Sequence, residues 1–240
     1  MKRLIAAVIL VGIVLASTAS ATILGTVNIN NHNNSLSDIG QLFGGGLTGE
    51  SCYTGIYSWT NTQAIGTAGL GTQVPDWGFC IELTQAPYNG WQDVVPLEEA
   101  PLPAQFGTPT QTVKANYIRE LWGRNFDSLW LTGGSANKQM AEAFSTALWE
   151  IIYEPGGPAA WDVTSGPGFH AANIEQAATA NLWLSRLNGD SAYFANNLVA
   201  TSTLCGQDYL VQLPLTSVPE PATIGLLGLG GLALIRKRRI

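Results

Sequence analysis

Both ends of this 240-residue chain carry a short apolar segment beside basic residues, so the fold is left to the residues between them. At the C-terminus, an apolar, glycine-containing run from Ala222 to Ile235 is followed by Arg236, Lys237, Arg238 and Arg239. As a helix it would be about 21 Å long, so it crosses a bilayer only if the bilayer thins or its flanks snorkel. Lys and Arg stay on the cytoplasmic side, which places the body of the protein outside. The alternative, a terminal helix in a soluble core, is disfavoured by the four charges.

The apolar run is preceded by Val218, Pro219, Glu220 and Pro221. A Pro-Glu-Pro turn, a short hydrophobic span and a basic terminus, in that order, resemble the PEP-CTERM sorting signal of exported bacterial proteins. The resemblance implies that the tail holds the protein at the inner membrane until a transpeptidase-like exosortase cleaves near the Pro-Glu-Pro turn. The mature chain is then released or joined to a surface or matrix component. We expect a linker and sorting tail over residues 215–240, with a transmembrane segment at 222–235.

The first 21 residues have the three parts of a secretory signal peptide. Two basic residues precede an apolar region from Leu4 to Ala16, and Ala19 and Ala21 supply the small side chains of an A-x-A cleavage site. We therefore expect a signal peptide at residues 1–21 and cleavage before Thr22. One exported domain, at residues 22–214, is long enough to bury a sizeable core.

Removal of both signals leaves an acidic domain. Between Thr22 and Pro219 the sequence has five basic and sixteen acidic residues, a net charge of −11. Such a surface repels nucleic acids and anionic polymers, so we expect no nucleic-acid partner. Zinc-protease, Walker and nucleophile-elbow motifs are absent from the sequence, and we expect neither a metal nor a cofactor.

The pattern of apolar residues predicts an α+β fold. Alternation or aromatic content predicts strands over 22–30, 52–60, 77–83 and 208–213. The stretch 31–49, rich in Asn, Ser and Gly, is predicted to be a loop. Apolar residues at i, i+3 and i+4 predict helices over 113–122, 137–153 and 174–187. Because the helices separate the last strand from the others, we expect that strand to close a sheet begun at the N-terminus.

Two segments resemble the signature segments of thioester domains in bacterial surface adhesins. The segment 79–83 (FCIEL) resembles the strand that supplies the thioester Cys, and 143–151 (AFSTALWEI) resembles the helix that begins Gln-x-Ala-x-Trp. The resemblance implies a β-sandwich or barrel-like sheet with an inserted helical part, in which the strand and helix lie side by side. Cys80 stands at the family Cys, but Ser145 stands at the glutamine and cannot give the acyl group. We expect Cys80 and Ser145 to mark a relic of the thioester site.

Three cysteines, Cys52, Cys80 and Cys205, belong to a domain that we expect to reach an oxidising compartment. Three thiols allow one disulfide and leave one over, and the sequence does not separate the three pairings. We favour Cys52 with Cys205, because both stand near strand edges while Cys80 lies in an apolar strand. For Cys80, a buried inert thiol is favoured over a reactive one.

A Ser-His-acid triad has few candidates, because the chain has only two histidines, His32 and His170. His170 with Asp162 and Ser165 is the one local set. A histidine in a Gly-Pro turn is more often merely exposed, so the sequence favours no triad.

Paired carboxylates are the other catalytic candidates. Glu98 and Glu99 are adjacent in a Pro-rich segment, so they are poorly placed to face one bond. Glu82, Glu150 and Asp162 come from different predicted elements and would have to meet in a cleft, as glycoside hydrolysis requires of its acid pair.

Tryptophan is abundant, and exposed indole rings suit stacking on sugars. The eight are Trp59, Trp77, Trp91, Trp122, Trp130, Trp149, Trp161 and Trp183. Most are expected in the core, because several stand on helical apolar stripes or in a buried strand. Trp91 and Trp161, beside Gly or loop residues, are the candidates for exposure, against the alternative that they plug loops onto the core.

Two classes of function remain. The first is an exported, exosortase-sorted protein of the cell surface or extracellular matrix, non-catalytic and associated with exopolysaccharide or biofilm. Its partners would be the sorting enzyme, the membrane through residues 222–235, and an exopolysaccharide. The alternative is an exported hydrolase of unknown substrate.

Overall fold

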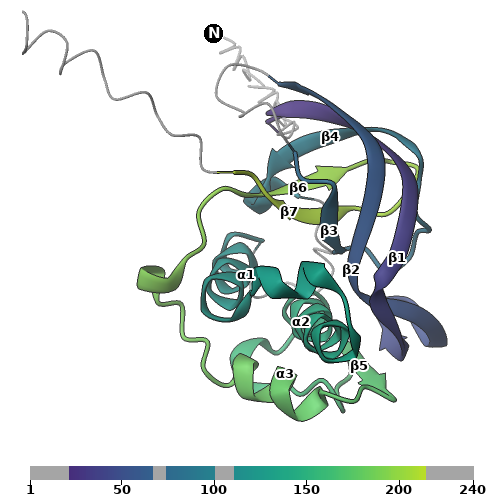
Figure 1. The fold of residues 1–240 in the computed structure, drawn as a ribbon. Helices are drawn as coiled ribbons and strands as arrows, with labels where there is room; N and C mark the ends of the chain where they lie inside the picture. Colours follow the sequence, from purple (N-terminus) through teal and green to yellow (C-terminus); the bar gives the residue numbers. More distant parts are fainter. Residues whose placement is uncertain (1–21, 67–73, 101–110, 215–240) are drawn as a thin grey trace, which may run out of the picture.

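The computed structural model describes residues 22–66, 74–100 and 111–214, which form a sheet and a group of helices (Figure 1). The expected signal peptide with Ala19 and Ala21, the sorting residues 218–221, the apolar segment 222–235 and the basic residues 236–239 all lie outside these ranges. Within the described ranges, no helix has the length and apolar character needed to cross a bilayer.

The strands of the described part make one antiparallel sheet that closes on itself. They are β1 (Gly25–Gly44), β2 (Leu47–Gly66), β3 (Trp77–Cys80), β4 (Gly90–Pro96), β5 (Phe169–Ala172), β6 (Leu198–Ser202) and β7 (Tyr209–Gln212). Their order is β2-β3-β7-β6-β4-β1-β5, and a further pairing of β2 with β1 joins the first six into a ring. A single closed sheet agrees with the barrel-like alternative and not with two stacked sheets.

The strand predicted at the C-terminal end of the domain is confirmed as β7. It pairs with β3 on one side and with β6 on the other. It therefore lies between β3 and β6 in the closed sheet and makes no ladder with β1.

The expectation of a loop over 31–49 is wrong. The Asn-rich stretch continues β1 as far as Gly44, and β2 starts again at Leu47. The irregular composition is absorbed by shifts of register between Asn28 and Leu36, and by Asn31, whose φ of 53° lies in the left-handed region that Asn tolerates. Asn and Ser are poor strand formers by themselves, so the pairing partners decide the conformation here.

The helices form an insertion between β4 and β6. They are α1 (Gln111–Asn125), α2 (Ser135–Tyr153) and α3 (Ala177–Leu184), and Figure 1 shows them grouped beside the ring. The three predicted helices are confirmed, although α3 is shorter than its expected range. Short strand β5 follows α2 and pairs with the far end of β1, at Gln41–Gly44. The observed architecture is thus α+β.

Aromatic side chains connect the helices to the closed sheet. Phe79 of β3 lies 4.7 Å from Phe144 of α2 between ring centroids, and Trp122 of α1 stacks on Phe126 at 4.4 Å. Trp77 of β3 stacks on the same two rings, 5.4 Å from Phe126 and 6.0 Å from Trp122. Burial of such rings contributes strongly to stability, so strand β3 and helices α1 and α2 are held as one core.

Candidate functional site

The two segments with thioester-domain resemblance lie side by side, as expected. The indole Nε1 of Trp149 on α2 donates a hydrogen bond to the backbone oxygen of Cys80 at 2.8 Å. Ser145 is fully buried, and its hydroxyl donates to the backbone oxygen of Gly55 on β2 at 3.2 Å. The adjacency is confirmed, while the relation to thioester domains stays a hypothesis.

The Cys80 thiol is placed for packing rather than for reaction. Its side chain is fully buried, and Sγ donates to the backbone oxygen of Glu82 at 2.8 Å. Burial raises the pKa of the Cys80 thiol, so the reactive thiolate is disfavoured. Ser145 directs its own proton to Gly55, so the two side chains engage different groups.

The favoured disulfide is not formed. Cys52, Cys80 and Cys205 are all free thiols. Cys52 lies on the arm of the β1–β2 hairpin, opposite Gly40, whereas Cys205 is exposed in the connection between β6 and β7. The sequence alone does not show that Cys52 and Cys205 lie in different parts of the sheet.

His170, Asp162 and Ser165 do not form a relay. The Ser165 hydroxyl donates directly to Asp162 at 2.8 Å, whereas Nδ1 of His170 lies 3.2 Å from the backbone oxygen of Gly166. The imidazole also stacks on Phe43 at 4.7 Å. A triad needs the histidine between the serine and the acid, and that order is absent from this set.

The adjacent acids Glu98 and Glu99 turn to different partners. Glu98 pairs with Arg119 of α1 at 2.7 Å, and Glu99 accepts a hydrogen bond from the backbone nitrogen of Thr22. The pair therefore joins the end of β4 to a helix and to the start of the domain.

Helix α2 carries a line of buried polar residues that sequence reasoning missed. Glu142, Thr146 and Glu150 lie in the helix and Glu154 directly follows its last residue; the four stand at intervals of four, and all are buried. Residues four apart share a helix face, so this spacing was the available signal. The apolar stripe predicted the helix but not the burial of its acids, because acids are normally expected on the solvent side.

Two of these acids have specific structural partners. Glu142 accepts a hydrogen bond from the hydroxyl of Thr54 on β2 at 3.1 Å, and burial raises its pKa. Glu154 accepts from the backbone nitrogens of Gly168 and Phe169, at 3.0 and 3.3 Å. Glu142 thus joins α2 to the ring, and Glu154 holds the start of β5.

Glu150 and Asp162, two of the three acids considered for a cleft, are brought together. The backbone nitrogen of Asp162 donates to Oε1 of Glu150 at 2.9 Å. Burial raises the pKa of Glu150 to about 8, and hydrogen bonds from Thr164 lower the pKa of Asp162 to about 2. Such a difference between two pKa values is typical of a catalytic acid and base. Glu150, however, is fully buried and out of reach of a substrate. Glu82 instead accepts from the backbone nitrogen of Thr84, at 2.7 Å.

The two tryptophans singled out in the sequence have different environments. Trp161 is half-buried, meets Tyr117 edge-on at 5.0 Å, and keeps its ring nitrogen out of solvent. Trp91 is 47% exposed on β4. Trp161 is thus a packing residue, and Trp91 is the exposed one of the two.

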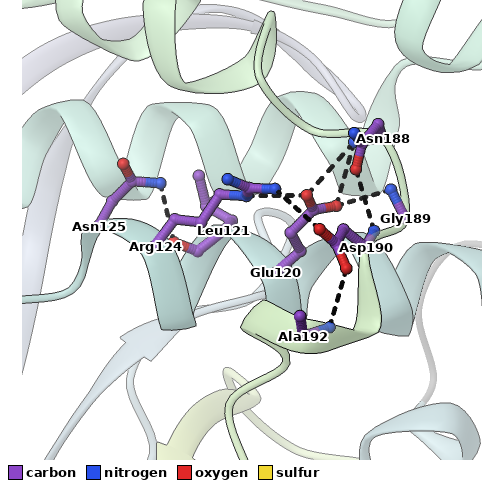
Figure 2. Close-up of polar contacts among 8 residues, drawn as sticks. All are labelled: Glu120, Leu121, Arg124, Asn125, Asn188, Gly189, Asp190 and Ala192. Atoms are coloured by element: carbon purple, nitrogen blue, oxygen red, sulfur yellow. Dashed lines mark hydrogen bonds and ion pairs between the residues drawn. The ribbon is translucent and has the colours of Figure 1, made fainter.

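A second structural acid, Glu120, was also missed by sequence reasoning. It is fully buried on α1 and accepts hydrogen bonds from the backbone nitrogens of Asn188 and Gly189, at 3.1 and 2.7 Å. Figure 2 shows its carboxylate facing this loop, with Arg124 completing an ion pair at 2.8 Å. The guanidinium of Arg124 lies over the ring of Tyr193 at 3.6 Å. Glu120 therefore fastens the connection between α3 and β6 to α1.

A comparison with known protein families gives a match at the C-terminal tail. The family described as the PEP-CTERM protein-sorting motif matches residues 217–239. This chain carries a PEP-CTERM sorting signal. No curated protein and no solved structure matches the chain.

The PEP-CTERM motif is the recognition signal for an exosortase, so a sorting enzyme is a partner of this chain. It also implies export with a membrane-anchored C-terminal signal. The matched residues include the Pro-Glu-Pro turn, the apolar run and the basic end on which the resemblance was based.

Proposed function

We propose that this chain is a non-catalytic protein of the cell surface or extracellular matrix, delivered there by exosortase processing at Pro219–Pro221. The single observation that carries the proposal is the PEP-CTERM motif at residues 217–239. In this proposal residues 1–21 direct export, and residues 222–235 hold the chain in the membrane until the tail is cut. The domain then acts outside, in contact with exopolysaccharide.

The environments of the polar residues support a binding role over a catalytic one. Glu142, Glu150 and Glu154 are buried and have partners within the fold. Ser165 and His170 are bonded to separate groups. An active site needs acid, base or nucleophile directed at a space that a substrate can enter, and these side chains are directed at the protein itself.

Substitution of Glu220 by Ala tests processing. In the native host, the wild-type protein should be recovered without its tail, and Glu220→Ala should accumulate as a heavier, membrane-retained form. Intact-mass spectrometry of both fractions measures the difference, and it also reports the N-terminus and any attached lipid or glycan. The exposed residue Glu175 offers a control, because Glu175→Ala changes the charge equally and should be processed like the wild type. Recovery of both wild type and Glu220→Ala with the tail intact and in the membrane would reduce the tail to a simple anchor.

A further inference from the structure

The outer face of β1, β4 and β6 presents an aromatic ring among polar groups. On β4, Gln92 is buried inside the ring of strands, while its neighbours Trp91 and Asp93 are exposed. The ladder with β1 pairs Trp91 with Asn28 and Asp93 with Thr26. Directly paired residues of an antiparallel sheet project to the same face, so these four side chains share the outer face.

The side chain of Asn28, one polar neighbour of Trp91, is held in place by a hydrogen bond. Asn30 donates its amide hydrogen to Oδ1 of Asn28 at 2.9 Å, which fixes which end of the Asn28 amide is oxygen and leaves the NH₂ group as the donor end. On the other side of β4, Ser202 of β6 pairs with Asp93. The face thus offers an amide donor, a carboxylate acceptor and the hydroxyl of Thr26 around one indole.

The exposure of Trp91 distinguishes it from the other tryptophans. It lies in a regular strand, where the fold does not need its ring to cover the core, and 47% of its surface meets solvent. Five others are at most 8% exposed, namely Trp59, Trp122, Trp130, Trp149 and Trp183. Half-exposed indole surface beside rigid polar groups is the composition of a recognition surface, in which the ring supplies contact area and the polar groups supply orientation.

We propose that this outer face binds a neutral polysaccharide, with the C–H face of a pyranose ring on Trp91. Its hydroxyls would donate to Asp93 and accept from Asn28. A neutral glycan fits best, because the domain carries a net charge of −11 and Asp93 lies within the face. The inference deepens the proposed surface role and rests on it, by naming the glycan class and the residues that meet it.

Affinity electrophoresis of the processed protein purified from its host tests the site. The gels contain hydroxyethyl cellulose, dextran or galactomannan as neutral probes, and polygalacturonate as an anionic one. At least one neutral probe should retard the wild type, and polygalacturonate should not. Trp91→Ala should raise the apparent Kd by at least about tenfold, and Trp91→Phe should raise it less. The apparent Kd values of Asn28→Ala and Asp93→Asn should lie between those of the two Trp91 variants.

Leu129→Ala is the matched control, because Leu129 is 61% exposed and lies on a 3-10 helix in the helical part. It should migrate like the wild type. Circular dichroism and the denaturation midpoint of each variant separate loss of binding from loss of fold. Equal retardation of wild type and Trp91→Ala, or migration unchanged by every neutral probe, would overturn the site. Neither result bears on processing at Glu220, so the two proposals fail separately.

Discussion

The backbone nitrogen of Thr22 donates a hydrogen bond to the carboxylate of Glu99, 77 residues further along the chain. Two residues later, the nitrogen of Leu24 donates to the oxygen of Val94 at 2.8 Å, and β1 begins at Gly25. The first residue of the expected mature chain is thus already attached to the segment that follows β4. Cleavage before Thr22 would turn this nitrogen into an ammonium group, and a charged donor strengthens the bond to a carboxylate.

N-terminal sequencing of the processed protein should begin at Thr22, because Ala19 and Ala21 supply the small side chains of the cleavage site.

The contact between Thr22 and Glu99 should add little stability. Glu99→Gln should lower the free energy of unfolding by no more than about 1 kcal/mol, because the pair is exposed, and added salt should reduce this effect. Urea denaturation at low and high salt measures it. Acetylation of the N-terminus is the control, since it removes the positive charge. A sequence that starts at Met1 would contradict the expected cleavage.

Cys80 should be inert in the folded protein. No acyl donor stands at position 145, so methylamine treatment followed by mass spectrometry should leave the mass unchanged. Ellman's reagent should react with exposed Cys205 much faster than with buried Cys80. Cys205→Ser is the control that identifies the fast thiol. A stable methylamine adduct would show a thioester and make the protein a covalent adhesin.

Glu150 should make the stability depend on pH. Its pKa is raised from 4.5 to about 8, so the folded state keeps a proton that the unfolded state has lost. This contribution is complete below about pH 4.5 and disappears as the pH rises through 8. Glu150→Gln keeps a neutral side chain, so its free energy of unfolding should exceed that of the wild type by roughly 2–4 kcal/mol above pH 8 and match it near pH 5.

Urea denaturation between pH 5 and 9 measures the two curves. Asp93→Asn, at an exposed acid, should run parallel to the wild type. Parallel curves for wild type and Glu150→Gln would show that Glu150 is ionised in the folded state over this range.

Thr201 on β6 is fully buried, and its Oγ1 has no hydrogen-bond partner among the residues that the structure describes. A buried polar group without a partner costs free energy, so Thr201→Val, which keeps the shape, should stabilise the protein by about 1 kcal/mol. The control is Thr146→Val on α2, whose hydroxyl donates to the backbone oxygen of Glu142 at 2.8 Å. It should destabilise by about 1 kcal/mol. Thermal and urea unfolding measure both, and a loss of stability in Thr201→Val would point to an ordered water at that hydroxyl.

Two arginine pairs on α1 should differ in strength. Glu120→Ala should lower the free energy of unfolding by about 3 kcal/mol, because it leaves two loop nitrogens and Arg124 without their buried partner. Glu98→Ala removes a pair that is 38% exposed at the acid and should cost at most about 1 kcal/mol. Hydrogen exchange of Asn188 and Gly189 should quicken only in the Glu120 variant. Similar losses for the two variants would mean that the buried carboxylate is not specially important.

The pattern of apolar residues predicted α2 and β7, although α2 from Ala141 onward and most of β7 are buried on every side. Helix α2 follows its apolar stripe from Met140 to Ile152, and β7 follows its short apolar run. The part of β1 after Asn30 was missed because its conformation comes from partners on β2, such as Ser58 opposite Asn33, and local propensity opposes it. Strands β4, β5 and β6 were not predicted for a related reason, since short strands gain definition only from their neighbours in the ring.

The site residues divide in the same way. The tail was readable because its order of turn, apolar run and basic end is contained in consecutive residues. The neighbourhood of Trp91 was not, because register alone places Asn28 beside it. Burial of Glu120 was also unreadable, since a single acid on a helix looks identical in sequence whether it meets water or backbone nitrogens.

Strand β7 ends at Gln212, only eight residues before Glu220. A fully extended chain covers at most about 3.6 Å per residue, so this tether reaches no further than about 29 Å. If a sorting enzyme cuts at Glu220, as proposed, its active site lies within about 29 Å of the end of β7. A longer linker between Gln212 and Pro219, with residues 219–221 unchanged, would show whether this short distance limits the rate of release.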